Sequence, residues 1–394
     1  MREVVMVSGA RTAIGDFMGS LTKMTAVELG TVAAIEAIKR AGIKPEDIDN
    51  VMGGHCMFAG TGGNIARQIQ GRAGILWEAP AATVHQACGS SMRALEIATE
   101  QILLGKSDIA LVIGAESMTN VPYVLQKARF GYRLGDGNDG PVDELVANSL
   151  ICPIAKVHMA ITAENVAEKY NVSREEQDEL ALLSHQRASK AIKDEIFKDE
   201  IVGVEVKTKK ETKIFDVDEH VRHDASLEGM AKLKPAFKKD GTVTAGNASG
   251  INDGACAAVI MTKEKAESLG LTPMCKIVAT ASAGVAPEIM GIGPVYAIPK
   301  VLKYAGLELK DIDLFEINEA FAAQFVGVSK ELNLDIEKVN VNGSGIALGH
   351  PVGMTGLRLV ISLAYEMARR DAKFGVASLC AGMGPAPATV IERI

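Results

Sequence analysis

The chain has 394 residues, of which 47% are hydrophobic and 4% aromatic, and it carries a formal net charge of -7. This length and composition suit a large core or two or three domains, and they exclude a disordered chain. The acidic balance disfavours a nucleic-acid binder. Six cysteines without regular spacing or a CxxC pair form neither a disulfide framework nor a zinc site.

The first segment, MREVVMVSGA, predicts a strand of the fold. It lacks the basic, apolar and small-residue sections of a secretory signal. No apolar run approaches the roughly 20 residues that span a bilayer. We therefore expect a cytoplasmic protein with reduced cysteines, and with neither a membrane nor a nucleic acid as partner.

The sequence contains an internal repeat. Residues 37–51 (AIKRAGIKPEDIDNV) return at 301–315 as VLKYAGLELKDIDLF, and residues 107–114 (SDIALVIG) return at 372–380 as AKFGVASLC. An amphipathic helix precedes each of the latter two segments, with an apolar face of Met92, Leu95, Ala98 and Ile102 in the first copy and of Leu357, Val360, Ala364 and Met367 in the second. The repeat predicts two related α/β halves, residues 1–117 and 251–394, each with a mostly parallel sheet covered by helices on both faces.

Residues 118–250, between the halves, predict an inserted domain. They contain the glycine-rich FGYRLGDGNDG (130–140), a helical segment and a lysine-containing stretch, KLKPAFKKDG. The glycine-rich segment is compatible with an assembly loop and equally with a flexible surface loop.

Cys88 lies in VHQACGSSMRALEIA (84–98), where a short strand-like run meets a helix. Unpaired N–H groups and the positive end of the helix dipole favour a thiolate at such a position. The alternative is a small buried apolar residue, as most intracellular cysteines are.

His350 lies in a second stretch, NGSGIALGHPVGMTG (342–356), ahead of the helix that corresponds to the one after Cys88. A histidine near a thiol can take its proton, which is the arrangement of covalent acyl transfer. A structural histidine and a metal ligand are the alternatives. The metal is the weaker of these, because no second ligand lies at a suitable spacing, and we expect no metal site.

Two further stretches carry polar groups after probable strands. EINEAFAAQF (316–325) places Asn318 where an amide can orient a water molecule or donate to an oxyanion, and SLCAGMG (378–384) places Cys380 before Gly382, whose N–H group no side chain shields. Each stretch alone also fits an ordinary loop beside a strand.

Together, the four stretches resemble the signature blocks of the thiolase family in order and spacing, and TAENVAEKY and TVTAGNASGINDGA resemble its loop-domain blocks. The resemblance covers the chain from end to end. It implies the α/β thiolase fold, with duplicated βαβαβαββ halves in five layers, α-β-α-β-α, and a loop domain at 118–250 that holds coenzyme A.

The resemblance also implies residue roles. Cys88 would be the nucleophile, His350 its base, and Cys380 the group that exchanges the α-proton of the second substrate. Asn318, through a water molecule, and His350 would form one oxyanion hole, and the N–H groups of Cys88 and Gly382 the other. The residues implied for coenzyme A are Leu150, His158, Met159, Arg222, Phe237, Ala245, Ser249, Ile251, Ala320 and Phe321.

The implied activity is the reversible condensation of two acetyl-CoA molecules to acetoacetyl-CoA through an acyl-Cys88 intermediate. Coenzyme A would be a substrate or product, with no permanently bound cofactor, and the chain would form a homodimer or homotetramer. A thiolase of broader chain length in fatty-acid degradation is one alternative, and a non-catalytic acyl-CoA binder is another. A reversible disulfide between Cys88 and Cys380 is a further hypothesis, against which stands the simpler expectation that both stay reduced.

Overall fold

The computed structural model describes residues 2–132, 134, 140–207 and 211–394. Its strands lie in the order β15-β16-β17-β14-β1-β13-β5-β3-β4, and β1 and β14 join the two halves through three residue pairs, Val4 to Met6 with Ile277 to Cys275. The first half contains β1 (Val4–Thr12), β2 (Gly15–Asp16), α1 (Ala26–Ala41), β3 (Asn50–Gly54), α2 (Ile65–Arg72), β4 (Ala81–Val84), α3 (Ser90–Leu103), β5 (Ile109–Ser117) and, after the insertion, β13 (Asn252–Thr262) and α7 (Lys263–Ser268). The second half contains β14 (Cys275–Gly284), α8 (Pro294–Ala305), β15 (Leu314–Ile317), α9 (Ala322–Leu332), α10 (Gly345–Leu348), α11 (Val352–Arg370), β16 (Phe374–Ser378) and β17 (Pro385–Glu392).

The prediction of mostly parallel sheets is wrong. β3 pairs in parallel with β4 and β5, as β15 does with β16, but β13 runs antiparallel to β1 and β5, and β17 runs antiparallel to β14 and β16. Residues 379–384, which join β16 to β17, are too few for the crossover that a parallel neighbour needs. The division into 1–117, 118–250 and 251–394 remains a proposal, and the pairing of β13 favours assigning that strand to the first half.

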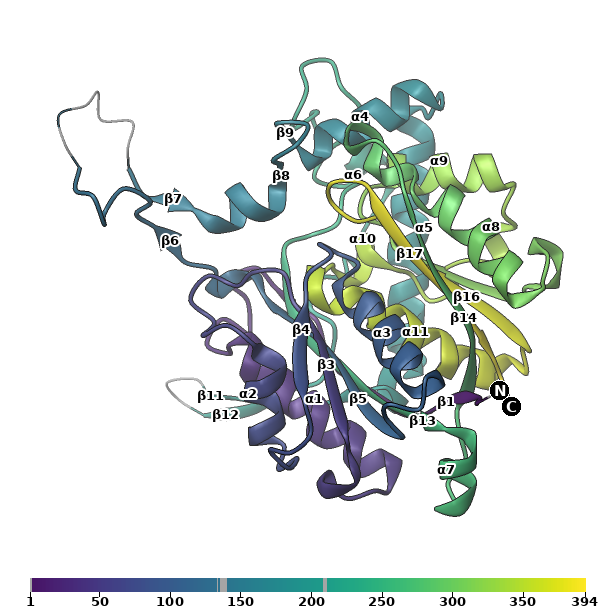
Figure 1. The fold of residues 1–394 in the computed structure, drawn as a ribbon. Helices are drawn as coiled ribbons and strands as arrows, with labels where there is room; N and C mark the ends of the chain where they lie inside the picture. Colours follow the sequence, from purple (N-terminus) through teal and green to yellow (C-terminus); the bar gives the residue numbers. More distant parts are fainter. Residues whose placement is uncertain (1, 133, 135–139, 208–210) are drawn as a thin grey trace.

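Helices α3 and α11 form the middle of the molecule. They pack against each other and against strands of both halves, whereas α1 covers β1 and β13 from outside and α8 covers β14 and β17 (Figure 1). The eight apolar residues predicted for the inner faces of these two helices are all buried. The layers therefore follow the expected order α-β-α-β-α.

A close approach between α3 and α11 fixes the relation of the two halves. A Cβ atom at Gly356 of α11 would lie 2.7 Å from the backbone nitrogen of Met92 in α3, so the two backbones nearly touch. The Ser91 hydroxyl donates to the Met354 carbonyl (3.0 Å) and accepts from the Leu357 N–H (2.9 Å). The N-terminal ends of both helices are thereby held side by side.

The insertion leaves the first half after β5 and returns at β13. It comprises β6 (Tyr123–Val124), β7 (Val142–Asp143), β8 (Ile151–Cys152), β9 (Val157–His158), α4 (Met159–Lys169), α5 (Arg174–Lys193), β10 (Ile201–Val202), β11 (Val204–Lys207), β12 (Thr212–Phe215) and α6 (Leu227–Ala231). An arm that carries β6 and β7 extends away from the layers (Figure 1). Residues 133 and 135–139 of FGYRLGDGNDG lie outside the described residues, so the expectation of an assembly loop stays a prediction. Among the described helices, none is both long and apolar enough to cross a membrane.

Candidate active site

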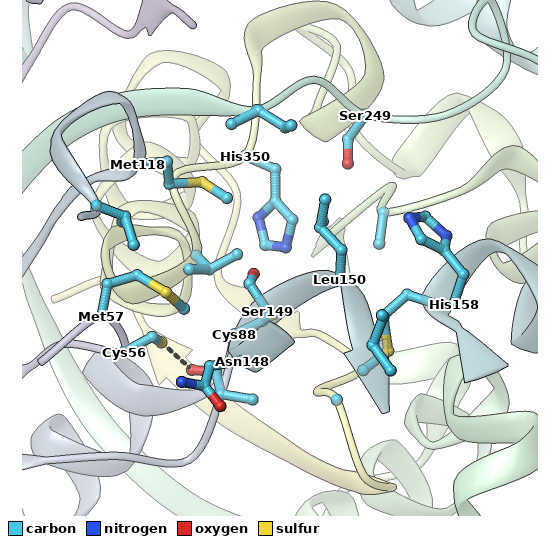
Figure 2. A pocket seen from close by; sticks show the side chains of 18 of the residues that line it. Cys56, Met57, Cys88, Met118, Asn148, Ser149, Leu150, His158, Ser249 and His350 are labelled. Carbon is cyan, nitrogen blue, oxygen red and sulfur yellow. Dashed lines mark hydrogen bonds between the residues drawn. The ribbon is translucent and has the colours of Figure 1, made fainter. Parts of the chain in front are cut away.

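A cavity of about 840 Å³ opens where β3, β4, β15 and β16 end, at the edge where α/β sheets place their binding sites. Cys88, His350, Cys380 and Gly382, predicted from separate stretches of the sequence, all line it. Figure 2 shows Cys88 and His350 on its wall. The hydrogen bonds of Ser91 between α3 and α11 explain this convergence, since Cys88 precedes α3 and His350 precedes α11.

Cys88 lies in a tight turn between β4 and α3. Ala87 before it adopts a φ of 46°, which is rare for a residue with a side chain. The turn is closed by the N–H groups of Gly89 and Ser90, which donate to the carbonyls of Gln86 and Ala87, both at 3.0 Å. The strained turn presents a half-buried sulfur to the cavity.

The expectation that the helix N-terminus makes Cys88 a thiolate is wrong, because the pKa of its thiol is raised and not lowered. Burial raises the pKa of Cys88 to about 11, although hydrogen bonds from the N–H groups of Gly382 and of Cys88 itself act in the opposite direction. Desolvation of the charged form outweighs the hydrogen bonds. Cys88 is therefore a thiol at neutral pH, and its reaction needs a base.

His350 is buried, and its ring is held from one side. Its Nδ1 lies 2.7 Å from the Thr355 hydroxyl, which donates its proton to the Pro351 carbonyl at 2.9 Å. The hydroxyl therefore accepts from Nδ1–H, which leaves Nε2 unprotonated. Burial, together with the positive charge of Arg358, lowers the pKa of His350 to about 3. The imidazole is thus neutral at physiological pH and can take a proton on Nε2.

Asn318 follows β15 and reaches the same histidine. Its amide nitrogen lies 3.4 Å from both ring nitrogens of His350, and its buried side-chain oxygen has no hydrogen-bond partner. Asn318 does not line the cavity directly. The unpartnered oxygen fits the expected role of holding a water molecule between Asn318 and a ligand.

Cys380 lies at the end of β16, almost fully buried beside Met290, Ala320 and Met159. Burial and the neighbouring Cys88 sulfur both raise the pKa of Cys380 above its ordinary value. Both cysteines line the same cavity. Both are free thiols in the structure.

Nine of the ten residues implied for coenzyme A line the cavity. They come from the insertion and from the NEAF stretch, which pair directly, since the Ser249 N–H donates to the Ala320 carbonyl at 3.0 Å. The rings of His158 and Phe237 stack with their centroids 4.6 Å apart. Arg222, the tenth, is exposed and does not line the cavity, so its role stays a prediction.

Other residues that line the cavity were not predicted from the sequence. These include Cys56, Met57 and Phe58 after β3, His85 after β4, Met118 after β5, and His220 in the insertion. They stand singly or in short apolar runs, and only their positions at the carboxyl ends of strands could have indicated them. In the described ranges, no group of three or more His, Cys, Asp or Glu side chains is arranged to hold a metal ion.

Fold and site together define an α/β protein of two fused halves, with two thiols and an imidazole at one cavity. Comparison with known proteins agrees: the family models "Thiolase, N-terminal domain" and "Thiolase, C-terminal domain" match residues 4–264 and 271–393. The chain therefore belongs to the thiolase family.

Individual relatives are similar along the whole chain. An acetyl-CoA acetyltransferase of Chromobacterium violaceum is 50% identical over 99% of this chain and 100% of that protein. The solved acetyl-CoA acetyltransferase from Syntrophomonas wolfei has a TM-score of 0.97 and 51% identity, with 100% of both chains covered. Human mitochondrial 3-ketoacyl-CoA thiolase in complex with CoA has a TM-score of 0.95 and 42% identity over 100% of this chain and 98% of that one.

Proposed function

We propose that the protein is an acetyl-CoA C-acetyltransferase, which condenses two acetyl-CoA molecules reversibly to acetoacetyl-CoA and free coenzyme A. The observation that carries this proposal is the convergence of Cys88, His350, Cys380 and the Gly382 N–H on one cavity. Family membership and the names of the relatives described above support it.

In the first half-reaction, the sulfur of Cys88 attacks the thioester carbonyl of acetyl-CoA while its proton passes to Nε2 of His350. The C–S bond to coenzyme A breaks, and the leaving thiolate takes that proton. Because Cys88 is a thiol with a pKa of about 11, the proton has to leave as the new C–S bond forms.

In the second half-reaction, the Cys380 thiol would first pass its proton to Nε2 of His350, because burial keeps Cys380 protonated at rest. The Cys380 thiolate then removes a proton from the α-carbon of another acetyl-CoA, and the resulting enolate attacks the acyl carbon on Cys88. The bond from that carbon to the Cys88 sulfur breaks, the Cys88 thiolate takes the proton back from His350, and acetoacetyl-CoA is released. Asn318 and His350 would stabilise the enolate oxygen, and the N–H groups of Cys88 and Gly382 the tetrahedral oxyanion. Both of these N–H groups hydrogen-bond the Cys88 sulfur, so they are also near the atom to which the oxyanion carbon would be attached.

The mostly apolar lining from the insertion would hold the pantetheine arm of coenzyme A, as a substrate that enters and leaves. The CoA complex of the human relative supports this use of the fold. We also propose a cytoplasmic location, supported by the six free cysteines, and a homodimer or homotetramer as the working form.

The test is a rapid-mixing measurement of free coenzyme A released on addition of acetyl-CoA. A burst of one coenzyme A per site is expected, together with one acetyl group on the peptide that contains Cys88. Cys88→Ala should give neither signal. Cys275→Ala is the matched control, because Cys275 is a buried thiol of β14 that does not line the cavity. Binding of acetyl-CoA without a burst would favour the non-catalytic binder.

A thiolase of broader chain length is the second candidate, favoured by the likeness to human 3-ketoacyl-CoA thiolase. Thiolysis rates for 3-ketoacyl-CoAs of increasing length separate the two. A steep fall beyond acetoacetyl-CoA is expected, and a flat series would favour the broader enzyme.

A further inference from the structure

A buried charged pair lies behind the Cys88 turn and takes no part in the mechanism above. Glu116 on β5 and His55 after β3 are 0% and 1% exposed, and Oε1 of Glu116 lies 2.8 Å from Nδ1 of His55. Taking two charges out of water is costly, and the loss of one partner leaves the other uncompensated. The pair therefore calls for a physical reason.

The contacts of His55 determine its protonation. Nδ1 faces the Ala115 carbonyl at 2.9 Å as well as Glu116, and Nε2 faces the Met57 carbonyl at 2.9 Å. Carbonyl and carboxylate oxygens only accept hydrogen bonds, so both ring nitrogens must carry a hydrogen. Burial acts to lower the pKa of His55, but Glu116 and the two carbonyls raise it above its ordinary value. His55 is therefore an imidazolium ion.

The Glu116 carboxylate joins two other segments of the chain to β5. Oε2 accepts from the N–H groups of Cys56 (2.9 Å) and Gly353 (3.1 Å), and Oε1 accepts from the Met57 N–H (3.3 Å). Gly353 lies in the first turn of α11, where a negative charge is favourable. Only glycine fits there, because a Cβ atom at Gly353 would lie 2.6 Å from Oε2.

Each of these segments leads to a reacting group. The Cys56 thiol donates to the Ala87 carbonyl at 2.9 Å, directly before Cys88 (Figure 2). Gly353 lies three residues after His350, in the first turn of α11, the helix that His350 precedes. One carboxylate thus connects the strained nucleophile turn of the first half to the histidine of the second.

We propose that His55 and Glu116 form a positioning pair that holds the Cys88 turn and the start of α11 in the relative placement that acyl transfer needs. This inference rests on the proposed function, since it concerns the same site. The pair touches no substrate. His55 holds the carboxylate in place, and the carboxylate accepts the hydrogen bonds from the Cys56, Met57 and Gly353 N–H groups.

Other titratable groups face the pair and belong in any measurement of pH dependence. The Glu116 charge acts to raise the pKa values of Cys56, Cys88, His85 and Asp253. Neutralising Glu116 should therefore make the Cys88 thiol more acidic, not less. A fall in activity together with a more acidic Cys88 thiol would therefore indicate lost positioning and not lost thiol reactivity.

The test compares Glu116→Gln, His55→Gln and the double variant in the full-length protein. Each single variant should lose about 10- to 100-fold in kcat for thiolysis of acetoacetyl-CoA, as expected for a displaced reacting group. KM should change little, because the coenzyme A residues belong to other segments. The double variant, which buries no charge, should lose less than the product of the two single losses. Glu200→Gln is the matched control, because Glu200 is a buried acid that pairs with Arg11 outside the main cavity.

Alkylation of Cys88 by iodoacetamide gives a readout that needs no turnover. Glu116→Gln should be alkylated faster than the wild type while its kcat falls. A kcat at the wild-type value in both single variants would overturn the proposal, as would losses that simply multiply in the double variant. If the single variants do not fold, the double variant decides, and a wild-type kcat there also overturns it. A wild type without a coenzyme A burst would instead refute the proposed function.

Discussion

The Thr355 hydroxyl is predicted to control which nitrogen of His350 acts as the base. It is the acceptor for Nδ1–H at 2.7 Å, and Thr355 is 1% exposed. Thr355→Val keeps the shape of the side chain and removes the acceptor. A buried N–H without a partner costs about 1–3 kcal/mol, so the proton should move to Nε2, the atom that needs to be free. At about 1.4 kcal/mol per factor of ten, kcat should fall roughly 5- to 150-fold.

The remaining partner of the ring does not oppose this shift. The Asn318 amide nitrogen is a donor that lies 3.4 Å from both ring nitrogens, so it favours neither tautomer. The assay is steady-state thiolysis of acetoacetyl-CoA, with Thr355→Ser as the control that retains the hydroxyl. Equal kcat values for the valine and serine variants would refute the tautomer argument.

Four further outcomes are expected. Since the pKa of Cys88 is about 11, its thiolate fraction and its alkylation rate by iodoacetamide should rise about tenfold per pH unit between pH 7 and 10, and a plateau below pH 9 would contradict this. Met159→Ala should increase kcat/KM for longer 3-ketoacyl-CoAs relative to acetoacetyl-CoA. The Met159 methyl group fills the cavity close to Gly382, since it would lie only 3.2 Å from a Cβ atom there. An unchanged ratio would show that another residue limits the length of the acyl chain. Gly353→Ala should lower Tm and kcat, because the added methyl group would lie 2.9 Å from the Ala115 carbonyl oxygen and 3.0 Å from the His55 Cα. Such overpacking lowers the free energy of unfolding by about 1–3 kcal/mol. A wild-type Tm would show that α11 can move away from these atoms. The hypothesis of a reversible disulfide between Cys88 and Cys380 predicts inactivation by mild oxidant and recovery with dithiol; activity that survives the oxidant, or that fails to return with dithiol, counts against it and favours two thiols that stay reduced.

The sequence stretches that carry the proposed site residues do come together in the fold, whereas the prediction of strand direction was wrong. Cys88, Asn318 and Cys380 follow β4, β15 and β16, and His350 lies between α10 and α11. Each lies in a stretch with distinctive neighbours, so the internal repeat and the family resemblance pointed to these residues. Strand direction had no such signal. β13 and β17 are apolar runs like the strands beside them. The short connection before β17 requires its antiparallel course, but the long insertion before β13 is compatible with either direction.

The sign of the Cys88 pKa and the His55–Glu116 pair could not be predicted from local sequence. The helix dipole follows from local sequence, but the desolvation that raises the pKa of Cys88 depends on all the segments packed around the sulfur. His55 follows β3 and Glu116 lies on β5, 61 residues further along the chain, and this spacing matches no catalytic motif. Their contact follows from the parallel register of β3 and β5, in which Gly54 pairs with Gly114.

The Ser91 bridge between α3 and α11 has a consequence for how the protein should fail under heat. The nucleophile belongs to one copy of the repeat and the base to the other, so neither copy carries a working centre alone. A small separation of the two copies at the contact between α3 and α11 would move the reacting atoms apart, while each copy still kept its helices. Thermal inactivation is therefore expected to precede the loss of helical circular dichroism.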